Sequence, residues 1–147
     1  MKIMAKKTKS ILSLIIIVLL YLGNEYLDLS PSSIDHSSKN NIEYLIQHQQ
    51  SNSQVQVTAK IFKLLPDDLH GSRHQRFLIK LPQGQTVLIA HNIDLAPKVN
   101  KLKKGTNISI YGEYEWNQKG GVIHWTHKDP SRRHIDGWID YRGGVYQ

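Results

Sequence analysis

The sequence predicts an all-β domain, a five-stranded, OB-fold-like Greek-key barrel, preceded by an N-terminal hydrophobic helix. Five segments between residues 54 and 127 alternate apolar and polar residues with a period of two, as strands with one buried face do. A segment with helical spacing of apolar residues separates the third of these strands from the fourth. Five strands with a short helix at that place follow the order of elements in an OB-fold. An SH3-like barrel is the alternative, and it would not need this helix.

The five expected strands are separated by stretches rich in turn-forming residues. They lie at residues 54–61, 74–81, 86–90, 107–116 and 122–127. The helix is expected over residues 95–102, where Leu95, Val99 and Leu102 share a helical face and Pro97 is tolerable only in a first turn. Residues after 127 are expected to form a C-terminal tail of the domain, which spans 54–147.

Residues 1–29 predict a signal peptide or a membrane anchor. Four lysines within the first ten residues precede an apolar run at residues 11–22. This run rises only about 18 Å as a helix, whereas the hydrocarbon core of a bilayer is roughly 30 Å thick. No small-x-small cleavage site stands out after the run, which favours an uncleaved anchor. In either case the lysines stay in the cytoplasm and the rest of the chain is exported.

Residues 30–53 predict a polar linker that contains one short helix. The stretch begins with Pro31 and several serines, which are typical of linkers. Asn40 or Asn41 can cap a helix, and Glu43 follows at the spacing of a capping box. The apolar residues that come next, Ile42, Leu45 and Ile46, share one face of that helix.

The charge of the chain favours anionic partners. Residues 54–147 contain 14 Lys and Arg against 8 Asp and Glu, so the expected barrel is basic without the N-terminal lysines. Nucleic acid, phosphate, acidic glycans and lipid headgroups are the partners that such a balance attracts. A solvated basic surface is the simpler interpretation. Cysteine is absent, which excludes disulfides, thiolate metal ligands and a cysteine nucleophile.

Four motifs give the chain a resemblance to a known family. They are Gly71–Phe77, Ala90–Pro97, Tyr111–Trp116 and Gly121–His127. In this order, over roughly residues 54–147, they resemble the bacterial family catalogued as domain of unknown function 3465. The resemblance implies a protein of the bacterial cell envelope, with residues 11–22 in the inner membrane and the C-terminal domain in the periplasm, or released there after cleavage. It implies no activity and no catalytic residue.

Four histidines near the ends of the third and fifth strands are candidate metal ligands. They are His91, His124, His127 and His134. Imidazole and carboxylate ligands without thiolate would suit a divalent transition metal such as zinc. In a regular strand His124 and His127 point to opposite faces, so they converge only if the strand bends or ends near Thr126. The alternative interpretation is that these histidines hydrogen-bond to the backbone and tie the tail to the barrel.

Basic and aromatic residues on or beside the second, fourth and fifth strands are candidate ligand-binding residues. They are Arg73, Arg76, Tyr111, Tyr114, Trp116 and Trp125. OB barrels bind polymers across one face, with cations on phosphates and aromatic rings on bases or sugars. Some of these rings must instead fill the core, because the chain has only two phenylalanines.

The sequence favours a binding module over an enzyme. We expect a module of the cell envelope that binds an anionic or polymeric ligand, either nucleic acid or glycan. The alternative is a metal-dependent hydrolase or nuclease that uses the His124 and His127 cluster. Glu113 and Glu115 share one side of the fourth strand and could serve as acid or base beside a histidine, although such pairs are usually solvated.

Overall fold

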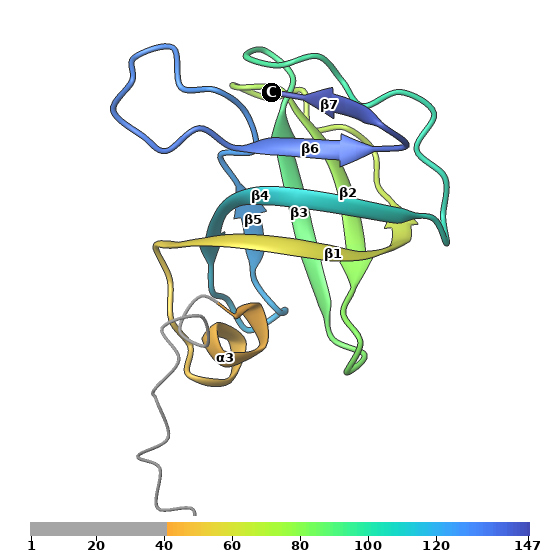
Figure 1. Cartoon of the computed structure of the whole chain (residues 1–147), viewed down its shortest axis with the longest axis vertical. Helices are drawn as coiled ribbons and strands as arrows, with labels where there is room; N and C mark the ends of the chain where they lie inside the picture. Colours follow the sequence, from red (N-terminus) through yellow and green to blue (C-terminus); the bar gives the residue numbers. More distant parts are fainter. Residues whose placement is uncertain (1–40) are drawn as a thin grey trace, which may run out of the picture. The chain divides into compact units, whose positions relative to one another are not determined.

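Five strands close into a barrel in the computed structural model, which describes residues 41–147 (Figure 1). The sheet order is β1-β2-β3-β5-β4-β6-β7, and an additional pairing of β1 with β4 completes the ring. The elements are α3 (Ile42–Gln47), β1 (Ser53–Leu64), β2 (His74–Lys80), β3 (Thr86–Asn92), β4 (Asn107–Glu115), β5 (Val122–His124), β6 (Trp138–Tyr141) and β7 (Gly144–Tyr146). The predictions of an all-β class and a five-stranded barrel are therefore confirmed.

Strand β1 pairs with two neighbours and so joins the two halves of the barrel. Its first part runs antiparallel to β4, from Ser53 opposite Tyr114 to Lys60 opposite Asn107. Its last part pairs with β2, and the register shifts between Ile61 and Lys63. A bulge of this kind bends and twists a strand, which lets β1 turn from one partner to the other. The only parallel contact in the described sheet joins β3 and β5.

The core is formed by the inward residues of the five strands, as their alternation predicts. Buried and exposed positions alternate along β1, and β4 shows the same period of two. The largest buried side chains include Phe77, Tyr114 and Ile110. Helix α3 adds Ile42 and Leu45 to the same core, so the short helix expected in the linker packs against the barrel.

The helix predicted over residues 95–102 is wrong, because this segment consists of turns and irregular chain. The side-chain amide of Gln75 on β2 hydrogen-bonds to both backbone groups of Val99, at 3.0 and 2.9 Å. The backbone of Val99 thus bonds to the barrel instead of to a neighbouring turn of helix. Leu95 is exposed, whereas Ala96 and Val99 are buried, which is not the helical face that the spacing suggested.

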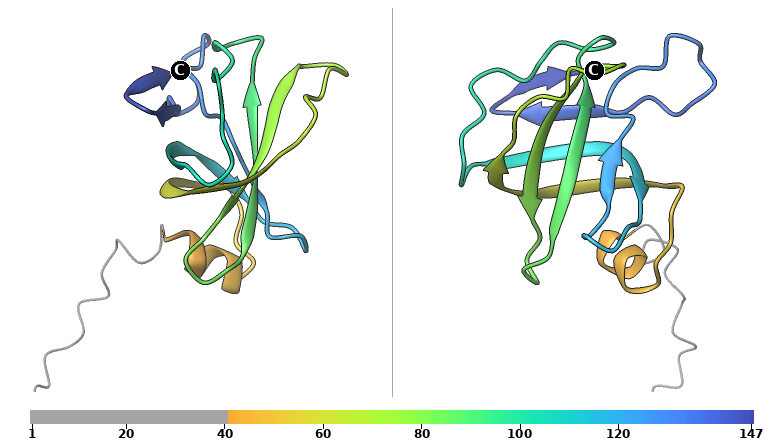
Figure 2. Two further views of the ribbon diagram at one scale, coloured as in Figure 1. Left: turned by 90° about the vertical axis from the view of Figure 1, so that its right-hand side faces the viewer. Right: turned by 180° about the vertical axis from the view of Figure 1, so that it is seen from behind.

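The chain after β5 ends in a hairpin, where the sequence predicts only a C-terminal tail. Strand β6 pairs antiparallel with β4, from Tyr111 opposite Trp138 to Ser109 opposite Asp140. Strand β7 pairs with β6, and Ile139 and Tyr141 are buried. Figures 1 and 2 show this hairpin at the end of the barrel opposite α3.

The predicted signal peptide or anchor, residues 1–29, lies outside the described residues. Within residues 41–147, no helix combines the length and the apolar character needed to cross a membrane.

Candidate functional site

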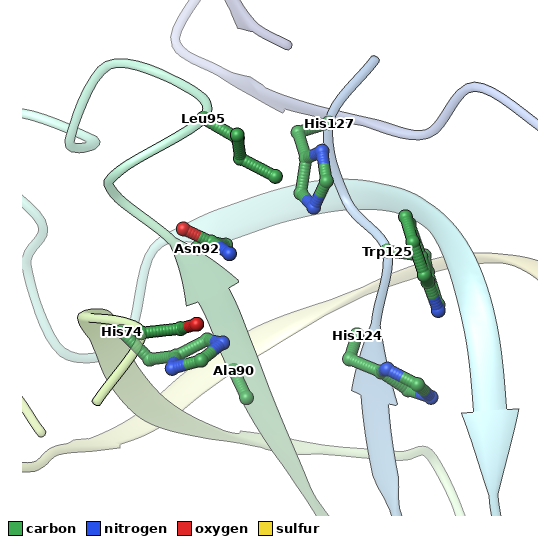
Figure 3. Close-up of a pocket in the computed structure, with 8 residues that line it drawn as sticks. His74, Ala90, Asn92, Leu95, His124, Trp125 and His127 are labelled. Atoms are coloured by element: carbon green, nitrogen blue, oxygen red, sulfur yellow. The ribbon is translucent and has the colours of Figure 1, made fainter. Parts of the chain in front are cut away.

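A groove on the outer face of β2, β3 and β5 is bordered by histidines and a tryptophan (Figure 3). Its volume is about 180 Å³, and it is lined by Ser72, His74, Ala90, Asn92, Leu95, His124, Trp125 and His127. Strand β5 ends at His124, and Trp125 has a positive φ of 51°. This left-handed residue breaks the alternation of the strand. As a result, His124, Trp125 and His127 all line the same groove.

Both ring nitrogens of His91 form hydrogen bonds within the domain. It is completely buried, and its Nε2 lies 3.1 Å from the carbonyl oxygen of Pro97. Because a carbonyl can only accept, Nε2 carries the proton and Nδ1 accepts from the Thr126 hydroxyl at 2.8 Å. Burial lowers the pKa of His91, in keeping with a neutral ring. Neither nitrogen is left for a metal ion, as the alternative interpretation of the histidines expects.

Both ring nitrogens of His134 are also occupied, one of them in an ion pair with Glu113 on β4. Its Nε2 donates to Glu113 Oε2 at 2.8 Å and its Nδ1 donates to the carbonyl of Ile135 at 2.8 Å, so the ring is an imidazolium. Burial alone would lower the pKa of His134, but the hydrogen bonds to Glu113 and Ile135 and the nearby charges of Glu113 and Asp129 together outweigh burial and raise this pKa. The ring stacks on Trp125, with centroids 4.1 Å apart and planes at 9°.

A short loop places His134 beside Glu113, and the Asp129 carboxylate holds this loop together. The Asp129 side chain accepts hydrogen bonds from Ser131, Arg133 and His134 backbone N–H groups and from the Ser131 hydroxyl. These bonds, those of Ser131 foremost, hold the pKa of Asp129 well below its usual range. Sequence reasoning missed this role, although Asp129-Pro130-Ser131 is a turn pattern in which Asp bonds to the following backbone.

The predicted histidine set is not brought together as one ligand cluster. Among residues 41–147, the set of His, Asp and Glu ligand atoms that converges within 4.8 Å consists of Glu113, Glu115 and His124. His127 is buried, and its Nδ1 donates to the carbonyl of Lys128 at 2.7 Å. Figure 3 shows the His124 ring directed away from His74, on the side of β4. Of the four predicted ligands, only His124 belongs to the converging set.

The six predicted ligand-binding residues are dispersed. Arg73 pairs with Asp94 at 2.6 Å, and Arg76 donates to the Pro66 carbonyl at 3.1 Å. Tyr114 is completely buried and its hydroxyl donates to the Gly120 carbonyl, so it belongs to the core. Burial raises the pKa of Tyr114 to about 12.

The remaining three aromatic residues occupy separate places. Tyr111 lies beside Trp138, with ring centroids 5.9 Å apart. Trp116 is partly buried and packs against the core. Trp125 alone among the six lines the groove. A continuous basic aromatic face across β2, β4 and β5 is therefore not formed.

A different basic aromatic surface lies where β1 meets β2 and β4, and we call it the lysine surface: Lys60, Phe62, Lys80 and Lys104. Lys60 is directly opposite Lys80 across the β1–β2 pair. The Nζ atoms of Lys80 and Lys104 lie 5.6 and 5.7 Å from the centroid of the Phe62 ring. Within the described residues, none of these three ammonium groups has a carboxylate within 4.0 Å.

A cavity of about 500 Å³ lies beside this surface, with Lys60 and Lys80 on its wall together with Thr58 and Asn107. Sequence reasoning missed the surface, although one signal for it was present. Lys60 and Phe62 follow Gln56 and Thr58 at the outward positions of β1. An aromatic ring at a solvent-facing position, beside a lysine, indicates a surface that contacts a ligand.

Comparison with known proteins places the chain in a family. The family model described as protein of unknown function (DUF3465) matches residues 26–147, which include every strand of the barrel. No curated protein and no solved structure matches the chain. The resemblance expected from the four sequence motifs is thus confirmed, and the match extends to the N-terminal side of the expected domain. The chain belongs to the DUF3465 family of proteins of unknown function.

Proposed function

We propose that the barrel is an OB-fold and that the protein is a binding module for an anionic polymer, which it holds at the lysine surface. The order β1-β2-β3-β5-β4, closed by β1 against β4, supports the OB assignment. OB-folds bind oligonucleotides and oligosaccharides on their outer surfaces. A repeating phosphate, sulfate or carboxylate group is the chemistry that the lysine surface would recognise.

The observation that carries this proposal is the cross-strand pair of Lys60 and Lys80. Like charges directly opposite each other destabilise a sheet. No carboxylate among the described residues compensates this pair. An anionic group in the adjoining cavity would relieve the repulsion, and the Thr58 and Asn107 side chains on its wall could donate further hydrogen bonds.

Phe62 gives this surface a second element of polymer recognition. Its side chain is 38% exposed, at the bulge between the two halves of β1. An exposed ring flanked by cations can stack on a base or a sugar while the cations contact the backbone. The lysine surface thus combines the two elements that the sequence predicted for a polymer-binding face, at different residues.

Polymer binding is expected to depend on Lys60 and Lys80. The double change Lys60→Gln and Lys80→Gln should weaken binding of the full chain about tenfold or more at 50 mM salt, because two phosphate-type contacts are lost. Titrations with single-stranded DNA and with heparin, followed by fluorescence anisotropy, measure this and separate nucleic acid from glycan. Affinity should fall steeply with added salt, since binding releases counterions.

The control is Lys119→Gln, which removes an exposed charge from the turn between β4 and β5. It should leave the affinity nearly unchanged. The Lys60→Gln change should also keep or raise the melting temperature, because it relieves a like-charge pair. Equal loss of binding in the Lys119 variant, or binding that does not respond to salt, would contradict the proposal.

We further propose that the domain acts in the bacterial envelope, held at the inner membrane by residues 11–22. The lysines followed by this apolar run support the proposal. Alkaline phosphatase fused after Gln147 is expected to be active, since this reporter needs an exported location. Deleting residues 11–22 should abolish its activity. Activity that survives the deletion, or a fusion that is inactive with the run intact, would contradict export.

A further inference from the structure

Three potential metal ligands converge on the outer wall of the barrel, away from the lysine surface. Glu113 and Glu115 are two residues apart on β4, so both side chains leave the same face of the strand. His124 on β5 is directly opposite Glu113 in the antiparallel pair. One ligand atom from each of the three residues lies within 4.8 Å of the others.

The imidazole of His124 supplies the observation that points to a ligand. Its Nε2 atom is inaccessible to solvent and has no hydrogen-bond partner among residues 41–147. The nearest acidic oxygen, Glu113 Oε1, is 3.6 Å away, beyond hydrogen-bond distance. A buried ring nitrogen without a partner reduces stability. A cation between the imidazole and the two carboxylates would satisfy this nitrogen and balance the carboxylate charge that the His134 imidazolium leaves uncompensated.

Neighbouring residues hold the cluster in place as outer partners do in metal sites. His134 donates to Glu113 Oε2 at 2.8 Å, which leaves Oε1 on the side of His124. The His134 ring is fixed in turn by stacking on Trp125 and by the loop that Asp129 organises. Hydrogen bonds to the ligating carboxylates commonly orient them and tune metal affinity.

We propose that Glu113, Glu115 and His124 bind a divalent transition metal ion, with zinc as the best match to one imidazole and two carboxylates. Nitrogen and oxygen ligands without thiolate fit zinc, and three protein ligands leave a position for water or a bound group. His124 also lines the groove beside His74 and His127, so the ion would lie at the edge of that groove. The site uses no residue of the lysine surface.

Metal content is the first test. Full-length protein in detergent, loaded with Zn²⁺ and dialysed, should retain one ion per chain by plasma mass spectrometry. His124→Ala and Glu115→Gln should each lower the zinc affinity at least about tenfold, the low end of the effect seen for losing even an outer partner. His70→Ala, which removes a fully exposed histidine elsewhere, is the matched control and should retain the ion.

Two further readouts keep the test independent of misfolding and of polymer binding. Zn²⁺ should raise the melting temperature of the unmutated protein and of the His70 variant, but not that of the Glu115 variant, because an ion that binds the folded state stabilises it. Bound Co²⁺ should show absorption bands that change in the His124 variant. The proposal would be overturned if the unmutated protein retained no zinc. It would also be overturned if the His124 and Glu115 variants, with native circular dichroism, retained as much zinc as the unmutated protein.

Discussion

Phe77→Ala is expected to lower the free energy of unfolding by about 3–5 kcal/mol, the usual cost of emptying a buried phenylalanine site. Phe77 is completely buried on β2, where it pairs with Ile89 on β3. The surrounding backbone is held by strand pairing on both sides of β2, so the cavity cannot collapse easily. Urea denaturation followed by circular dichroism measures the loss.

The chain offers a matched control, because its other phenylalanine is on the surface. Phe62 is 38% exposed at the bulge of β1, and Phe62→Ala should cost less than about 1.5 kcal/mol, since little apolar surface leaves the core. The same variant should weaken polymer binding if the lysine surface is the ligand site. Equal destabilisation by Phe77→Ala and Phe62→Ala would contradict the placement of Phe77 in the barrel interior.

Gly121→Ala is expected to cost about 2–5 kcal/mol. Gly121 has a φ of +87°, and a left-handed residue with a side chain costs about 1–2 kcal/mol. An added Cβ would also lie 2.3 Å from the buried ring of Tyr114, and such overpacking costs about 1–3 kcal/mol more. Thermal unfolding of the purified variant tests this.

Gly105→Ala separates the two contributions. Its φ of +84° nearly equals that of Gly121, but an added Cβ meets nothing within 4 Å. This variant should therefore lose only the backbone contribution, about 1–2 kcal/mol. If Gly121→Ala lowers the stability no more than Gly105→Ala does, the Tyr114 ring moves aside without cost, and the expected overpacking is absent.

Most strands could be predicted from the sequence because their inward residues alternate along one buried face. Residues 74–81 and 107–116 differ from β2 and β4 only at their last residue. The fifth strand is shorter than expected, since it ends at His124, where the left-handed Trp125 follows. A positive φ at tryptophan has no signature in a single sequence.

The two errors in the fold share a physical cause, which is that tertiary contacts decide short segments. The spacing of Leu95, Val99 and Leu102 is helical, but Gln75 binds the Val99 backbone and prevents the helix. The β6–β7 hairpin consists of strands of four and three residues, too short for a clear period. Pairing with β4 stabilises it, and that contact is distant in sequence.

Candidate site residues were harder to predict than strands, because their roles depend on partners from other strands. Arg73 is paired by Asp94, and His91 by Pro97 and Thr126, so neither is free for a ligand. The cross-strand pairing of Glu113 with His124 could have been predicted from the sequence. A hairpin turn at Asn117–Gly121 joins the two strands, and its length sets which residues are opposite each other.

Closure of the barrel has a consequence for how the chain folds. The pairing of β1 with β4 joins Ser53 to Tyr114 and Lys60 to Asn107, and no local turn brings these strands together. A long loop must close first, and barrels dominated by such pairing fold in about milliseconds to seconds. Until closure, β1 has an unpaired edge that could pair with β4 of another copy. A lysine on that edge, such as Lys60, discourages this pairing, so the charge proposed to hold a polymer also protects the folding chain from aggregation.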